Sequence, residues 1–112
     1  MPTVRALFVC EGNRHRSPTA ARLYGSTTGV EARSAGLSPL ARTELTEELL
    51  AWADAVFVME PRLEKLLRRR FAPALEGKRL VCLHIPDDYQ FMQPELIEVL
   101  TEKLAPHLGA LG

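Results

Sequence analysis

A cysteine and an arginine stand six positions apart in residues 10–18, directly after the apolar run of residues 6–9. A deprotonated thiol is a strong nucleophile, and a planar guanidinium can hold two oxygens of a phosphoryl group. A loop between a strand and a helix adds unpaired backbone N–H groups, which bind anions. Cys10 and Arg16 therefore predict a pocket for a phosphate-sized oxyanion, with a nucleophile at its floor.

The residues around this pair suit such a loop. Gly12 permits a close backbone approach or unusual backbone angles, and Asn13 tolerates a positive φ. Ser17 can cap a helix whose first residue is Pro18, and its hydroxyl could also donate a hydrogen bond to the cysteine sulfur. We therefore expect nucleophilic catalysis on phosphorus through a phosphocysteine intermediate.

The rest of the chain alternates between short apolar runs and segments of helical periodicity. Strands are predicted at residues 3–9, 30–34, 55–59 and 79–83, and helices after Ser17, after Thr43, from Pro61 and from Pro94. This alternation favours a parallel sheet that is covered by helices on both faces. We predict a single domain over residues 1–112, an α/β protein with a three-layer αβα sandwich and a four-stranded parallel sheet of order 2-1-3-4.

An acidic loop at residues 84–93 follows the fourth predicted strand and contains Asp87 and Asp88. Open parallel sheets bind ligands beyond the carboxyl ends of their strands. The loops after strands one and four leave the sheet at this same edge, so we expect them to converge. A carboxyl group at that place could act as a general acid, and the spacing alone leaves either aspartate open for the role.

Composition and charge exclude several classes of protein. The chain carries 14 Lys and Arg against 14 Asp and Glu, so no basic excess suggests a nucleic-acid partner. No apolar stretch approaches the roughly 20 residues of a membrane span, and the N-terminus lacks a secretory signal pattern. Two distant cysteines fit a reducing compartment, so we predict a cytoplasmic protein, a monomer or weak dimer. His84 and His107 lack ligand-type spacing, and we expect neither a metal nor a cofactor.

The cysteine motif closely resembles the signature of low-molecular-weight protein tyrosine phosphatases, above all their compact bacterial branch. The resemblance covers nearly the whole chain. It rests on residues 8–18, Ser34-Ala35-Gly36, Val58-Met59-Glu60 and Pro86-Asp87-Asp88-Tyr89, the last being similar to the family's Asp-Pro-Tyr. It implies a cofactor-free P-loop hydrolase that acts on a phosphorylated protein or a small aryl phosphate.

The resemblance also implies roles for single residues. Cys10 would be the nucleophile, Arg16 the phosphate clamp and Ser17 the residue that stabilises the thiolate. Asp87 would be the general acid, and Tyr89 would flank the aromatic ring of the substrate, with Asp88 beside it. The phosphate would be bound by the loop residues Glu11, Gly12, Asn13, Arg14, His15 and Arg16.

Four positions depart from the family pattern. Asp88 replaces a proline, which leaves Asp87 or Asp88 as the acid, and Asp87 is preferred. Glu11 would oppose a thiolate unless its side chain points outward, and His15 replaces a second cysteine of many relatives. Arg14 adds positive charge at the rim, where phosphoarginine phosphatases of this family carry threonine. We therefore expect aryl phosphates to be preferred over phosphoarginine.

Two other functions are compatible with the scaffold. Arsenate reductases pass oxidation from the loop cysteine to two further cysteines, whereas this chain offers only Cys82, in an apolar strand that favours a buried thiol. A phosphoryl-binding module without turnover would not need a nucleophile, an arginine and an acid together. We therefore predict a phosphomonoester hydrolase that acts as a protein tyrosine phosphatase.

Overall fold

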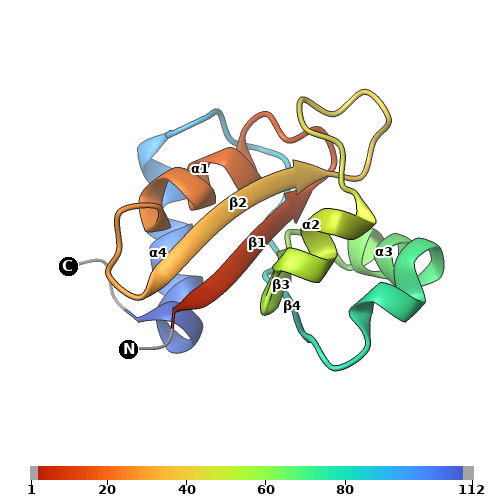
Figure 1. The fold of residues 1–112 in the computed structure, drawn as a ribbon. Coiled ribbons are helices and arrows are strands. Elements are labelled where there is room, and N and C mark those ends of the chain that lie inside the picture. Colours follow the sequence, from red (N-terminus) through yellow and green to blue (C-terminus); the bar gives the residue numbers. More distant parts are fainter. Residues whose placement is uncertain (1–2, 110–112) are drawn as a thin grey trace.

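The computed structural model describes residues 3–109, in which strands and helices alternate along the chain (Figure 1). The strands are β1 (Val4–Cys10), β2 (Val30–Gly36), β3 (Ala55–Val58) and β4 (Arg79–Cys82). All neighbouring strands pair in parallel, and the sheet order is β2-β1-β3-β4. The predicted parallel sheet and its strand order are confirmed.

The central strand β1 is buried on both faces of the sheet. Ala6, Phe8 and Cys10 enter one hydrophobic cluster, whereas Leu7 and Val9 enter a second cluster on the opposite face. Successive side chains of a strand point to opposite faces, so a strand covered on both sides must be apolar at every position. This burial explains the continuous apolar run before the cysteine motif.

Two helices cover each face of the sheet. The helices α1 (Arg16–Tyr24) and α4 (Pro94–Leu108) lie on the face of Cys10, and α2 (Glu47–Trp52) and α3 (Pro61–Leu75) lie on the other (Figure 1). The predicted three-layer αβα sandwich is therefore confirmed. None of the helices within residues 3–109 is both long and apolar enough to cross a membrane.

Two strands run further toward the site than the sequence predicts. β1 includes Cys10 and β2 continues to Gly36, and these two residues pair with one another. Gly36 donates to the Thr43 carbonyl at 2.8 Å and accepts from the Leu45 N–H at 2.8 Å, which prolongs β2 beyond the predicted end. β3 and β4 each end one residue earlier than predicted.

Candidate active site

The loop between β1 and α1 has its backbone carbonyls turned away from the space above Cys10. The carbonyls of residues 10–12 accept hydrogen bonds from the N–H groups of Leu37, Ser38 and Arg42 at 3.0, 3.0 and 3.1 Å. In a planar trans peptide the N–H points opposite to the carbonyl, and the described chain has no cis peptide. The N–H groups of residues 11–13 therefore face the other side, where they form a nest for an anion.

The sulfur of Cys10 lies within this nest. It is 3.2 Å from the Asn13 N–H, which donates to it, and 2.9 Å from Ser17 Oγ. Asn13 has a φ of 53°, as its residue type allows, and its Nδ2 donates to Ser17 Oγ at 2.9 Å. The Ser17 hydroxyl has two acceptors within reach, the sulfur at 2.9 Å and the Ala35 carbonyl at 3.4 Å, and the sulfur is the nearer of the two. The sulfur therefore lies beside one backbone N–H donor and one hydroxyl group.

The prediction that Ser17 caps a helix is wrong. α1 begins at Arg16, so the N-cap is His15, whose side chain makes no capping hydrogen bond. Ser17 is the second helical residue and is fully buried beside Cys10. Its hydroxyl contacts the cysteine sulfur because β1 ends at Cys10, next to the first turn of α1.

Gly36 permits the close packing of the loop against β2. A Cβ atom at this position would lie 2.5 Å from the Glu11 carbonyl oxygen and 2.6 Å from the Ala41 Cβ. Real Cβ atoms do not approach other atoms so closely, so any side chain would push the loop away. Gly12, by contrast, would place a Cβ no nearer than 3.8 Å to another atom, and among loop residues 10–15 the positive φ lies at Asn13.

Arg16 is held from two sides and keeps part of its guanidinium free. Only 2% of the residue is exposed. Its Nη1 donates to Glu60 Oε1 at 2.5 Å and to the Ile85 carbonyl at 2.8 Å. Its buried Nε has no hydrogen-bond partner among the described residues and lies 3.7 Å from Asp87 Oδ1. A buried guanidinium with an unused N–H is suited to an oxyanion.

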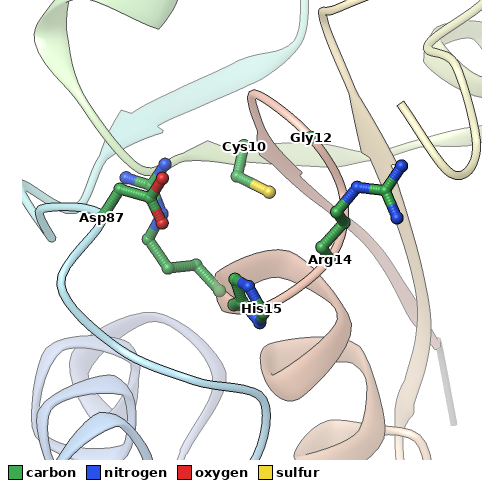
Figure 2. A pocket seen from close by; sticks show the side chains of 6 residues that line it. Cys10, Gly12, Arg14, His15 and Asp87 are labelled. Carbon is green, nitrogen blue, oxygen red and sulfur yellow. The ribbon is translucent and has the colours of Figure 1, made fainter. Parts of the chain in front are cut away.

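A cavity of about 140 Å³, here called the cysteine cavity, brings these groups together. It is lined by Cys10, Gly12, Arg14, His15, Arg16 and Asp87. Figure 2 shows Cys10 between Asp87 on one side and Arg14 on the other, with the Arg14 guanidinium turned away from the sulfur toward the rim. The predicted convergence of the loops after β1 and β4 is confirmed.

The loop that carries Asp87 is anchored at both ends. Ile85 donates its N–H to the Met59 carbonyl at 2.7 Å, and its own carbonyl accepts from Arg16. Further along, the Met92 N–H donates to Thr19 Oγ1 at 2.9 Å. The carboxylate of Asp87 itself is 64% exposed, so it sits at the mouth of the cavity, where it can meet both a leaving group and water.

Glu11 points away from the sulfur, which removes the conflict seen in the sequence. Its Oε1 accepts from Arg62 Nη2 at 2.6 Å on the surface. This hydrogen bond raises the pKa of Arg62 above its usual value. Arg62 also lies 3.6 Å from Glu60, so Glu11, Arg62, Glu60 and Arg16 form a line of alternating charges from the loop past the start of α3 to α1.

The remaining predicted site residues lie around the cysteine cavity rather than in its lining, except His15. His15 lines the cavity, and its buried Nδ1 has no hydrogen-bond partner within residues 3–109. Asp88 is exposed and does not line this cavity. Tyr89 is half-buried and packs against the hydrophobic cluster of Cys10. The roles of Asp88 and Tyr89 beside the substrate stay predictions.

The second cysteine lies on the other face of the sheet. Cys82 pairs in register with Val58 and packs against the cluster of Leu7 and Val9, opposite the cluster of Cys10. Burial raises the pKa of the Cys82 thiol. The sheet therefore separates the two sulfurs, which disfavours a thiol relay between them. Within residues 3–109, no group of three His, Cys, Asp or Glu side chains could hold a metal ion.

Two contributors to the site have no clear signal in the sequence. In the sequence, Glu60 stands out only as part of the family-like stretch Val58-Met59-Glu60, yet its carboxylate is the ion-pair partner of the buried Arg16. Leu40 is 82% exposed and lines a second cavity of about 360 Å³, the entrance cavity, together with Gly12, Arg14 and Asp87. The sequence alone could not place this exposed leucine at the entrance cavity.

The fold of this chain is similar to that of several solved structures. No family model and no curated protein matches the chain. Among solved structures, the YwlE arginine phosphatase from Geobacillus stearothermophilus is 25% identical, with a TM-score of 0.69 over 94% of this chain and 92% of that one. The tyrosine phosphatase Wzb from Escherichia coli K30 in complex with phosphate is 23% identical, with a TM-score of 0.76 over 98% and 99%.

A third similar structure is the low-molecular-weight protein tyrosine phosphatase SP-PTP from Streptococcus pyogenes. It is 15% identical, and its TM-score is 0.75 over 94% of this chain and 93% of that one. In each case the similarity spans nearly both chains, so the entire αβα sandwich is shared. The resemblance expected from the cysteine motif is thus confirmed at the level of architecture: the chain has the fold of the low-molecular-weight protein tyrosine phosphatases.

Proposed function

We propose that this chain is a phosphatase that hydrolyses aryl phosphomonoesters, such as phosphotyrosine, through a phosphocysteine intermediate. The single observation that carries the proposal is the shared cavity. It joins a sulfur that accepts from the Asn13 N–H and contacts the Ser17 hydroxyl, a buried guanidinium with a free Nε and an exposed carboxylate. The similarity of the fold to solved phosphatases also supports phosphatase activity.

In the first step the Cys10 thiolate attacks phosphorus, and the bond between phosphorus and the phenolic oxygen breaks. Asp87, in its protonated form, gives its proton to the leaving oxygen, so a neutral phenol departs. The Arg16 Nε and the N–H groups of residues 11–13 hold the phosphoryl oxygens while charge develops on them. Glu60 and the Ile85 carbonyl keep the guanidinium in place throughout.

In the second step water attacks the phosphocysteine. The Asp87 carboxylate takes a proton from this water, the P–S bond breaks, and inorganic phosphate and the Cys10 thiolate are released. The Ser17 hydroxyl, 2.9 Å from the sulfur, stabilises the thiolate as it leaves. Between the two steps Asp87 changes from acid to base, and Cys10 changes from nucleophile to leaving group. The enzyme thereby returns to its starting state.

Steady-state hydrolysis of para-nitrophenyl phosphate tests the proposal. Cys10→Ser should lower kcat by about four orders of magnitude or more, because a neutral hydroxyl replaces the nucleophile. Cys82→Ser is the matched control and should keep nearly full activity, since Cys82 lies on the opposite face of the sheet. Equal activity of the native chain and Cys10→Ser would refute the proposal.

The same assay decides which aspartate is the acid. Asp87→Asn should lower kcat by about 100-fold or more, the usual contribution of general acid catalysis. Asp88→Asn should have a much smaller effect, because Asp88 does not line the cysteine cavity. A larger loss in Asp88→Asn would reassign the role.

A further inference from the structure

A third cavity, here called the side cavity, lies beyond the loop formed by residues 37–39. Its volume is about 260 Å³, and the proposed hydrolysis does not use it. It is lined by Glu11, Leu37, Ser38, Pro39, Arg62, Leu63, Leu66 and Arg70. It therefore lies between the loop after β2 and α3.

The side cavity is connected to the nucleophile through shared walls. The cysteine cavity and the entrance cavity share Gly12, Arg14 and Asp87. The entrance cavity in turn shares Glu11 and Ser38 with the side cavity. The three cavities are thus successive neighbours, from Cys10 past the phosphate-binding loop to α3.

The lining of the side cavity is apolar over much of its surface. Leu37 and Leu63 are buried, Leu66 is half-buried, and Pro39 is exposed at the edge. Binding of an aliphatic side chain against such a lining is favourable, because it removes apolar surface from water. A charged phosphoryl group would lose its hydration against this apolar lining, so we do not expect it to bind there.

The charges of the side cavity leave one cation without an ion-pair partner. Glu11 and Arg62 neutralise each other at 2.6 Å. Arg70 donates to the Leu37 carbonyl at 2.9 Å, a contact that holds it over the cavity, but makes no ion pair within residues 3–109. The side cavity therefore complements an apolar group that carries a negative charge next to it.

We propose that the side cavity binds the flank of a phosphotyrosyl peptide, taking an aliphatic side chain next to an acidic residue that pairs with Arg70. This inference rests on the proposed function. An occupant of both the cysteine cavity and the side cavity must cross the entrance cavity, which a small aryl phosphate cannot do. A polypeptide presents a phosphorylated side chain and a second side chain on one backbone, and so it can fill both.

The test compares phosphotyrosine peptides of equal length whose flanks carry leucine with glutamate, leucine with lysine, or serine with glutamine. The native chain should hydrolyse the leucine–glutamate peptide with a kcat/KM about tenfold above that of the serine–glutamine peptide. Arg70→Glu should invert the preference between the glutamate and lysine peptides. The matched control Arg69→Glu should not, because Arg69 is exposed and lines none of the three cavities.

Para-nitrophenyl phosphate separates this inference from the proposed function. Its hydrolysis should be equal in native, Arg70→Glu and Arg69→Glu chains, since it does not reach the side cavity. Leu66→Gln provides a second variant, in which the advantage of the leucine–glutamate peptide over the serine–glutamine peptide should fall well below that of the native chain. If the native chain hydrolyses para-nitrophenyl phosphate but treats all three peptides alike, the inference is overturned and the function stands. If it hydrolyses no substrate, both fail.

Discussion

At the scale of single residues, Arg16 divides its guanidinium between the fold and the site. Nη1 is engaged by Glu60 and by the Ile85 carbonyl, whereas the buried Nε has no partner among the described residues. A lysine could not perform both tasks, because it presents one point charge in place of a planar fork. The arginine is therefore required at this position for geometry as much as for charge.

Arg14 is the residue that we expect to decide between two kinds of phosphate. It lines both the cysteine and entrance cavities, and it makes no ion pair within residues 3–109. Its positive charge should repel the guanidinium of phosphoarginine and leave a neutral aryl ring unaffected. The native chain should therefore favour an aryl phosphate over phosphoarginine by about tenfold or more in kcat/KM.

Replacing Arg14 tests this assignment. Arg14→Thr should lower the ratio of the two kcat/KM values by about threefold or more, the size of an exposed charge contact. The control Arg42→Thr removes an exposed arginine outside both cavities and keeps its backbone hydrogen bond to Gly12. A faster turnover of phosphoarginine by the native chain would contradict the role given to Arg14.

The residues of the loop could be predicted because their chemistry is specific to their spacing. A cysteine and an arginine six positions apart, with Asn13 between them, require a particular backbone. The structure has that backbone, with a φ of 53° at Asn13. For Ser17, the sequence predicts the contact with the cysteine sulfur but wrongly predicts a helix cap. A serine before a proline is typical of a helix cap, and only the burial of Cys10 above the first turn of α1 gives the hydroxyl its other partner.

At the scale of elements, the phosphate-binding loop depends on neighbours that are distant in sequence. The segment of residues 37–42 binds three loop carbonyls, and Gly36 leaves room for the loop to approach β2. These contacts could not be predicted from the sequence, because a glycine after a strand equally indicates a simple turn. The parallel pairing of the strands was predictable, because strands that alternate with helices form parallel sheets covered on both faces.

The ion pair between α1 and the start of α3 gives a prediction at this scale. Glu60 and Glu64 each pair with an arginine and are similarly exposed, at 24% and 28%. Their partners differ, because Arg16 is 2% exposed and Arg68 is 58% exposed. Glu60→Gln should therefore lower the free energy of unfolding by about 1.5–3 kcal/mol, since it leaves a buried cation poorly compensated.

Glu64→Gln is the matched control for this change. It removes a surface pair between residues one helical turn apart, which contributes only about 0.2–0.5 kcal/mol. Urea denaturation of both variants measures the two losses on one scale. Equal losses would mean that Glu60 does not hold Arg16 in solution as it does in the structure.

At the scale of the whole molecule, the sheet divides the chain into two chemical halves. One face carries Cys10, α1 and the loop with Asp87, and the other carries Cys82 and α3. Both halves reach the site at the edge where β1 and β4 end, where Arg16 from one side pairs with Glu60 from the other. The architecture thus gives Cys10 polar partners and leaves Cys82 in an apolar layer.

This division predicts distinct reactivity for Cys82. Burial raises its thiol pKa, and because a thiol reacts as the thiolate, the folded chain should require a higher pH than the unfolded chain for alkylation. In Cys10→Ser, where Cys82 is the sole remaining thiol, iodoacetamide at pH 8 should react about tenfold or more slowly with the native chain than in guanidinium chloride. The alkylation rate should rise with pH in both states, and in the folded chain this rise should occur at a higher pH. Identical pH profiles would mean that Cys82 is open to solvent, and a relay of oxidation to this sulfur would then have to be considered again.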